Sequence, residues 1–174
     1  MNQWWKRSKP DELQPIPWLA PNVIEYLESL LHADMRVLEH GSGGSTLWLA
    51  ARVKAVTSVE GDEKWRAQIK GRAGANVRLY AGNYPSDGMK RGRFDLLLID
   101  GEPVETRATW LYLAEKIVKP GGWIVLDNAN RPEYARERIY LNTCAELVQR
   151  FDGNQPGTLY LVTEFYRMEH ASRP

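Results

Sequence analysis

The sequence predicts an α/β protein with a doubly wound, mostly parallel sheet of seven strands and an antiparallel edge at its C-terminal end. Two observations predict this fold class. Short apolar segments alternate with segments of helical periodicity through most of the chain, whereas the last two apolar segments have only a Gly/Pro-rich loop between them. Alternating strands and helices are typical of parallel strands joined by right-handed crossovers. Two consecutive strands without an intervening helix favour antiparallel pairing.

The elements follow in order from the N-terminus of what we expect to be a single domain, 1–174. Residues 1–20 are polar, rich in tryptophan and interrupted by prolines, which indicates an extended arm that could close over a substrate. Pro21 suits the first turn of a helix whose apolar residues recur at helical spacing as far as Leu31. Further helices are expected at 45–53, 62–72, 103–118 and 132–148, and strands at 36–40, 55–60, 77–80, 94–100, 123–127 and twice within 147–168.

Particular residues support several of these boundaries. The segment "FDLLLID", 94–100, is apolar almost throughout and indicates a strand buried on both faces. The helix before the fifth strand is expected to stop at "KPGG", 119–122, because proline cannot continue a helix and glycine permits a turn.

Composition limits the function classes. With 23 basic and 22 acidic residues the net charge is +1, so the chain lacks the basic excess of a nucleic-acid binder, and we expect no nucleic acid among its partners. No apolar run approaches the roughly 20 residues that cross a membrane, and 1–9 is not a signal peptide, so we expect a cytoplasmic protein without a membrane partner. The single cysteine, Cys144, excludes an internal disulfide framework.

A glycine turn is the first candidate binding element. In "VLEHGSGGSTLWLA", 37–50, Gly41, Gly43 and Gly44 permit a sharp bend and a close approach to a ligand. The helix that follows offers main-chain N–H groups to an anionic group. Glu60 ends the next strand, 19 residues after Gly41, a spacing that suits a carboxylate on the two ribose hydroxyls. The turn therefore predicts a nucleoside that carries a charged group.

Polar residues also mark the ends of other predicted strands. In open α/β sheets, ligands bind at the carboxyl ends of the strands, where polar side chains form the rim of a cleft. The residues with this placement are Glu39, His40, Glu60, Asp100, Asp127 and Asn128.

A dinucleotide-binding enzyme would share the strand, glycine turn and ribose-binding acid. Its G-x-G-x-x-G or G-x-G-x-x-A pattern needs a small residue at the sixth position, so that the helix packs closely on the strand. Thr46 occupies that position, and its branched side chain argues against a pyrophosphate there. A nicotinamide-dependent oxidoreductase stays open as an alternative.

Four segments in register carry a family resemblance: "VLEHGSGGST", "VTSVEGDEKW", "FDLLLIDG" and "VKPGGWIVLDN". Together they resemble the class I S-adenosylmethionine-dependent methyltransferases, which have a Rossmann-like fold. The resemblance implies that Glu39 faces the methionine amino group, Ser45 and Thr46 its carboxylate, and Glu60 the ribose. The cofactor-binding residues that it implies are Glu39, His40, Gly41, Ser42, Gly43, Ser45, Thr46, Glu60, Gly61, Asp62, Trp65, Gly82, Asn83, Tyr84, Asp100 and Gly101.

The catalytic candidates are Asp100 and Asp127. With Asn128 they resemble the metal ligands of catechol and caffeoyl-CoA O-methyltransferases, and oxygen ligands of this type suit Mg²⁺. The alternative is that these residues position the substrate or act as a general base without metal, and no metal is assigned.

The acceptor is expected to be a small or medium-sized molecule, methylated on oxygen. Residues 100–103 read "DGEP" and contain no aromatic residue to stack on a flipped base, which also argues against a nucleic-acid substrate. Trp4, Trp5 and Trp18 of the arm could line the acceptor site or serve as core or interface residues. A protein that binds S-adenosylmethionine without catalysis remains the second alternative, and the sequence does not indicate the oligomeric state.

Overall fold

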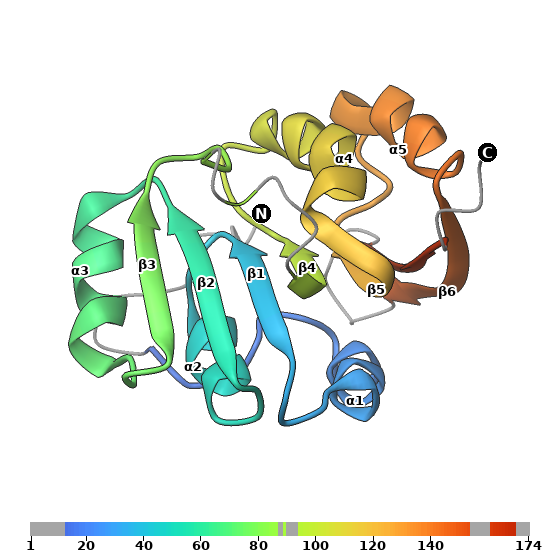
Figure 1. Cartoon of the computed structure of the whole chain (residues 1–174). Helices are drawn as coiled ribbons and strands as arrows, with labels where there is room; N and C mark the ends of the chain where they lie inside the picture. The colour runs from blue at the N-terminus through green and yellow to red at the C-terminus, as the bar shows by residue number, and fades with distance from the viewer. Residues whose placement is uncertain (1–12, 87–88, 90–93, 154–160, 170–174) are drawn as a thin grey trace.

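The computed structural model describes residues 13–86, 89, 94–153 and 161–169. Its centre is a seven-stranded sheet with the order β3-β2-β1-β4-β5-β7-β6, in which β7 pairs antiparallel with β5 and β6 (Figure 1). The predicted fold class is therefore confirmed. The strands are β1 (Arg36–His40), β2 (Ala55–Glu60), β3 (Val77–Ala81), β4 (Phe94–Ile99), β5 (Val118–Leu126), β6 (Ala145–Gly153) and β7 (Leu161–Met168).

Helices cover both faces of this sheet (Figure 1). They are α1 (Pro21–Leu30), α2 (Gly44–Ala50), α3 (Glu63–Arg72), α4 (Thr106–Ile117), the 3₁₀ turn η4 (Pro132–Tyr134) and α5 (Ala135–Leu141). Successive residues of a pleated strand point to opposite faces of the sheet, so the central strands contribute side chains to two apolar cores. Leu38 packs in the core beneath α4 and α5, whereas its neighbour Val37 packs in the core beneath α1 and α2. The central strands are thus buried on both faces.

The segment before α1 contributes to the fold. Pro21 occupies the first turn of α1, as its fixed φ angle predicts. Leu13 is buried, and its carbonyl accepts a hydrogen bond from Arg72 of α3 at 2.6 Å. Trp18 is 59% exposed and is not a core residue. Trp4 and Trp5 lie outside the described residues.

The helix expected at 132–148 is shorter than predicted. The helical segment ends at Leu141, and β6 begins at Ala145, which pairs with Met168 of β7. Ala145 and Val148 continue the helical spacing of Leu141, but both lie in the long antiparallel strand β6, where Ala145 pairs with Met168 and Val148 falls at a register shift between Leu147 and Gln149. Tertiary pairing overrides the local pattern here.

The "KPGG" segment belongs to β5 rather than to a connecting turn. Val118 already pairs with Phe94, and the register then shifts before Leu96 pairs with Trp123. Gly121 adopts the left-handed region at φ 71°, which absorbs the irregularity. The helix before it ends one residue earlier than predicted, at Ile117.

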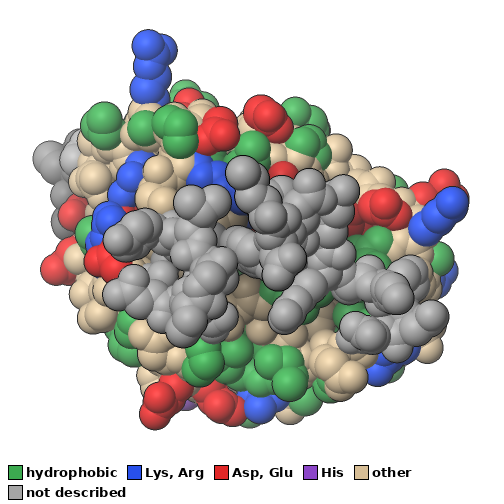
Figure 2. All heavy atoms as spheres, turned by 180° about the vertical axis from the view of Figure 1, so that it is seen from behind, with side chains coloured by type: hydrophobic (Ala, Val, Ile, Leu, Met, Phe, Trp, Pro, Cys, Tyr) green, Lys and Arg blue, Asp and Glu red, His purple; other side chains and the backbone are tan. Residues whose placement is uncertain are grey.

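The surface of the protein carries side chains of both charges. Acidic and basic side chains are interspersed over the face shown in Figure 2, in keeping with the net charge of +1. Among the described residues, none of the helices has both the length and the apolar character needed to cross a bilayer.

Candidate active site

The carboxyl ends of four parallel strands meet at one edge of the sheet. His40 at the end of β1 pairs with Val59 of β2 and Ile99 of β4, and Ile99 pairs with Leu126 of β5. Residues that follow these positions are therefore neighbours in space. The polar residues predicted at the strand ends therefore gather at this edge, but only Glu60 and Asp100 are partly exposed. The others are buried: Glu39, His40, Asp127 and Asn128.

The turn after β1 lies directly against the turn after β4. Gly41 has a φ of +91°, and a β-carbon at this position would lie 2.5 Å from the α-carbon of Gly101. A side chain on Gly101 would in turn clash with the ring of His40. Glycine is therefore required at both positions, for conformation at Gly41 and for close approach at both.

Glu39 lies beneath the glycine turn and is fully buried. Its carboxylate accepts hydrogen bonds from the hydroxyls of Ser45 (2.5 Å), Thr46 (2.6 Å) and Ser58 (2.7 Å). Burial raises the pKa of Glu39 to about 7, although the three hydroxyl donors act in the opposite direction. The hydroxyls of Ser45 and Thr46 are thus directed inward, toward Glu39, and this arrangement fixes the first turn of α2.

Glu60 joins the glycine turn to the start of α3. One carboxylate oxygen accepts a hydrogen bond from the main-chain N–H of Ser42 at 2.9 Å, and the other from that of Asp62 at 2.8 Å. Asp62, not Glu60, caps α3 by accepting the N–H of Trp65. The indole of Trp65 donates to the carbonyl of Ser42 at 2.6 Å. The sequence-predicted residues Ser42, Glu60, Asp62 and Trp65 therefore form one connected group.

The loop after β3 approaches the same group. Gly82 donates its main-chain N–H to the carbonyl of Glu60, and the carbonyl of Asn83 accepts from the indole of Trp110 in α4. The side chain of Asn83 packs against Gly61, and its Oδ1 is buried without a hydrogen-bond partner among the described residues. Tyr84 is exposed.

His40 is buried on the opposite face of β1 and stacks on Trp110. The hydroxyl of Thr106 donates its only hydrogen to the carbonyl of Pro103, so the contact at 3.0 Å is donated by Nε2 of His40. Burial, with the nearby charge of Arg107, lowers the pKa of His40 to about 3. The imidazole is thus neutral, packed and a weak base.

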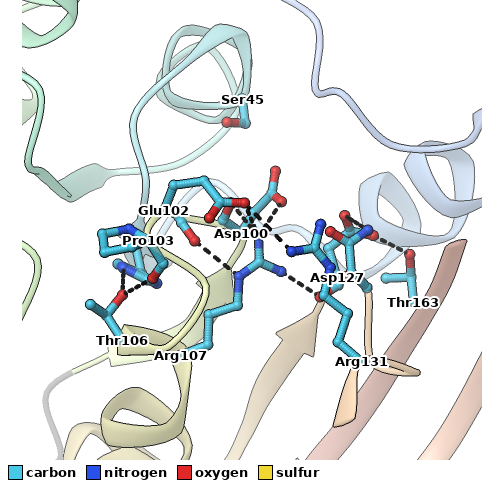
Figure 3. A network of polar contacts seen from close by, with 12 residues as sticks. Ser45, Asp100, Glu102, Pro103, Thr106, Arg107, Asp127, Arg131 and Thr163 are labelled. Atoms are coloured by element: carbon cyan, nitrogen blue, oxygen red, sulfur yellow. Dashed lines mark hydrogen bonds and ion pairs between the residues drawn. The ribbon is translucent and has the colours of Figure 1, made fainter. Parts of the chain in front are cut away.

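Asp100 and Asp127 follow β4 and β5, and the guanidinium of Arg107 donates hydrogen bonds to the carboxylate of Asp100 and to the main-chain carbonyl of Asp127 (Figure 3). The side chain of Asp100 is 31% exposed, whereas Asp127 is buried. The two carboxyl groups lie close enough for each to affect the pKa of the other. Burial, together with repulsion by Asp127, raises the pKa of Asp100, and Arg107 opposes that rise. Asp100 is therefore the carboxyl group of this pair that faces solvent.

Comparison with known proteins identifies the family. The family model of a methyltransferase domain matches residues 38–129, which is more than half of the chain and contains the glycine turn, Glu60, Asp100 and Asp127. The chain belongs to the class I S-adenosylmethionine-dependent methyltransferases. No curated protein sequence matches the chain.

Solved structures share the fold of this methyltransferase at low sequence identity. The N-methyltransferase NodS from Bradyrhizobium japonicum WM9 has a TM-score of 0.67 at 15% identity, over 86% of this chain and 93% of that one. NodS has also been solved with S-adenosyl-L-homocysteine. An rRNA methylase from Streptococcus thermophilus has a TM-score of 0.69 at 14% identity (89% and 100%), and a predicted O-methyltransferase from Agrobacterium tumefaciens has 0.63 at 17% (83% and 80%).

These neighbours correct one expectation. We expected no nucleic acid among the partners, on the basis of net charge and of the missing aromatic residue after β4. That exclusion is wrong, because an rRNA methylase shares this fold over 89% of the present chain. An RNA acceptor is compatible with the fold.

The residues predicted as metal ligands do not fit a divalent ion in this methyltransferase. The two oxygens of Asp127 accept hydrogen bonds from Thr163 (2.7 Å) and from the side-chain amide of Asn128 (2.8 Å). Asp100 accepts from Arg107 at 3.3 Å. The fixed positive charge of Arg107 beside Asp100 disfavours a cation, and hydrogen-bond donors already use part of the acceptor capacity of Asp127. The described residues also contain no group of three His, Cys, Asp or Glu that could hold a metal.

The sequence did not reveal the partners that hold these carboxylates. Arg107 interrupts the buried face of α4, and a charged residue on a buried helix face is the signal that could have indicated it. Ser58, Thr163 and Tyr134 resemble ordinary strand or helix residues, and no sequence signal distinguishes them. Tyr134 donates its hydroxyl to the carbonyl of Asn128, which has a φ of 54°.

Proposed function

We propose that this methyltransferase transfers a methyl group from S-adenosylmethionine to an oxygen atom of a small or medium-sized acceptor, with Asp100 as the proton acceptor. The observation that carries the proposal is the partly exposed carboxyl group of Asp100, held beside the glycine turn by Arg107 and Asp127. The transfer chemistry is known for the family, so the proposal concerns the acceptor and the residues that act on it.

The proposed cofactor site comprises the glycine turn, Glu60 and the loop after β3. Glu60 has a second lone pair on each oxygen beyond those that Ser42 and Asp62 use, so it can also accept the ribose hydroxyls. The buried Oδ1 of Asn83 needs a donor, and the exocyclic amine of adenine supplies one. The carboxyl group of Glu39 lies below the turn, where its ionised form would attract the methionine ammonium group.

The chemistry follows from the placement of Asp100. When bound, S-adenosylmethionine supplies an electrophilic methyl group on a sulfonium. Asp100 takes the proton from the acceptor hydroxyl while the oxygen lone pair forms the new bond to carbon, and the electrons of the broken C–S bond stay on sulfur. A raised pKa makes Asp100 a stronger base than an ordinary aspartate, which suits this role near neutral pH. Arg107 and Asp127 hold it in place.

The segment before α1 would form one wall of the acceptor site. The carbonyls of Gln14 and Ile16 lie directly against Gly44, where a β-carbon would clash with both. Ile16 and Trp18 are exposed on this segment and could contact an acceptor. We therefore propose that residues 13–20 of the arm pack on the glycine turn, and that the chain is a single domain, 1–174.

RNA is the second candidate acceptor. The rRNA methylase of Streptococcus thermophilus and the tRNA (m1A58) methyltransferase TrmI of Aquifex aeolicus, with TM-scores of 0.69 and 0.66, support it. With an RNA acceptor, S-adenosylmethionine would again supply the methyl group and Asp100 would again act on the acceptor group.

A radiolabelled methyl-transfer screen tests the proposal. Purified protein and methyl-labelled S-adenosylmethionine are incubated with panels of phenols, alcohols and amines and with total RNA. Label in a hydroxyl compound, lost in Asp100→Asn, supports the proposal. Label in amines or RNA alone would refute the proposed acceptor class.

A further inference from the structure

Arg107 is a buried cation that links two strand-end turns. Its side chain is 1% exposed, yet it donates hydrogen bonds to three main-chain carbonyls and to the carboxylate of Asp100. Nε donates to the carbonyl of Gly101 at 2.9 Å, one terminal nitrogen to the carbonyl of Asp127 at 2.6 Å, and the other to the carbonyl of Asp100 at 2.7 Å. The turn after β4 and the turn after β5 are thus bound to the same guanidinium.

The charge of Arg107 is also compensated locally. A buried charge is tolerated when it is hydrogen-bonded and paired with an opposite charge. Asp100 lies 3.3 Å from the guanidinium, and Glu102, which is mostly exposed, lies 4.0 Å away. The planar fork of five N–H groups suits three carbonyls and a carboxylate better than a compact ammonium would.

These contacts account for the poor fit of a divalent ion. A metal bound by Asp100 and Asp127 would face the fixed positive charge of Arg107 within a few ångströms, and like charges at that range repel strongly where they are shielded from water. Asn128 and Thr163 reinforce the arrangement, because both donate hydrogen to Asp127.

We propose that Arg107 is the resident cation of the strand-end site: it positions Asp100 and Asp127 and excludes a divalent metal ion from them. Methyl transfer by this chain is therefore metal-independent, and Arg107 acts as a positioning residue through Asp100. The catalytic part of this inference rests on the proposed function, whereas the exclusion of metal can be measured without any acceptor.

Mn²⁺ binding, followed by electron paramagnetic resonance, tests the exclusion. The wild-type protein should leave the free Mn²⁺ signal unchanged. Arg107→Met leaves the carboxyl pair without its cation and should bind Mn²⁺ at least about tenfold more tightly than wild type. Adding Asp127→Asn to this variant should abolish the binding. Arg107→Lys, which keeps the charge, should exclude Mn²⁺ as the wild type does.

Arg138→Met is the matched control. Arg138 also pairs with a buried carboxylate, Glu164, but Arg150 remains beside that carboxylate when Arg138 is removed. This variant should gain no Mn²⁺ site, and a gain equal to that of Arg107→Met would overturn the proposal.

Two further outcomes would also overturn it. One is Mn²⁺ binding to the wild-type protein that Asp127→Asn abolishes. The other is a folded Arg107→Met variant, shown by circular dichroism and by binding of S-adenosylhomocysteine, that takes up no Mn²⁺. If Arg107→Met does not fold, the measurement of Mn²⁺ binding to the wild-type protein can still overturn the proposal. Failure of the wild-type protein to bind S-adenosylhomocysteine would instead count against the proposed function and leave the Mn²⁺ result intact.

Discussion

Glu39→Gln should change how the stability of this methyltransferase depends on pH. Glu39 is fully buried beneath the glycine turn, and its pKa is raised from 4.5 to about 7, chiefly by burial. Between these two values the folded protein binds more protons than the unfolded chain does. Stability therefore falls as the pH rises from about 4.5 through 7, and the loss is complete above the folded pKa. Glutamine does not titrate and removes this contribution.

The two pKa values set the magnitude. Linkage gives a loss of about 1 kcal/mol at pH 5 and about 3 kcal/mol at pH 8 in the free energy of unfolding of the wild type, for a pKa of 4.5 unfolded and about 7 folded. The stability of Glu39→Gln relative to wild type should therefore improve by about 2 kcal/mol between these two pH values. Any fixed packing cost of glutamine among the hydroxyls of Ser45, Thr46 and Ser58 cancels in this difference.

Urea denaturation at pH 5 and pH 8, followed by circular dichroism, measures the effect. Glu25→Gln, on the exposed side of α1, controls for the loss of one carboxylate. A relative stability of Glu39→Gln that stays within about 0.5 kcal/mol between the two pH values would refute the argument that burial governs this carboxylate.

Three further predictions concern the glycine turn, the proposed base Asp100 and the buried cation Arg107. Gly41→Ala should lower the free energy of unfolding by about 2 kcal/mol or more, because alanine is strained at φ +91° and its β-carbon meets Gly101. The control Gly71→Ala, in α3 with open space around it, should be neutral or stabilising. Equal melting temperatures for the two variants would contradict this prediction. Asp100→Asn should reduce kcat by at least about 100-fold while calorimetry shows nearly unchanged affinity for S-adenosylhomocysteine, and a comparable loss of affinity would assign Asp100 to cofactor binding instead. Transfer to the acceptor found by the screen should persist in excess EDTA, and loss of activity that Mg²⁺ restores would contradict the role of Arg107.

Local pattern predicted most of the fold because the central strands are buried on both faces. Such strands read as continuous apolar segments, and "FDLLLID" is the clearest of them. The error at 132–148 has a physical cause. Leu141, Ala145 and Val148 recur at helical spacing, but the pairing of β6 with β7 joins residues far apart in the sequence and determines the structure of Ala145 and Val148.

The strand-end acids could be predicted because parallel strands in register bring their carboxyl ends together. Their partners could not. Whether Arg107 reaches Asp100 or solvent depends on how α4 packs across β4 and β5, and that packing is not encoded in the spacing of one segment. The same applies to Ser58, which contacts Glu39 only because β2 pairs with β1.

Calorimetric titration of S-adenosylhomocysteine into wild type and Glu60→Ala tests the central claim most directly. Glu60 joins the glycine turn to α3 through the N–H groups of Ser42 and Asp62, and it is the proposed acceptor of the ribose hydroxyls. Charged acceptors contribute roughly 1.5–3 kcal/mol per hydrogen bond, so the variant should bind at least about tenfold more weakly than wild type. The wild type should bind one equivalent of S-adenosylhomocysteine and bind NAD much more weakly. Equal affinity of the two proteins for S-adenosylhomocysteine, or tighter binding of NAD, would contradict the cofactor site described above.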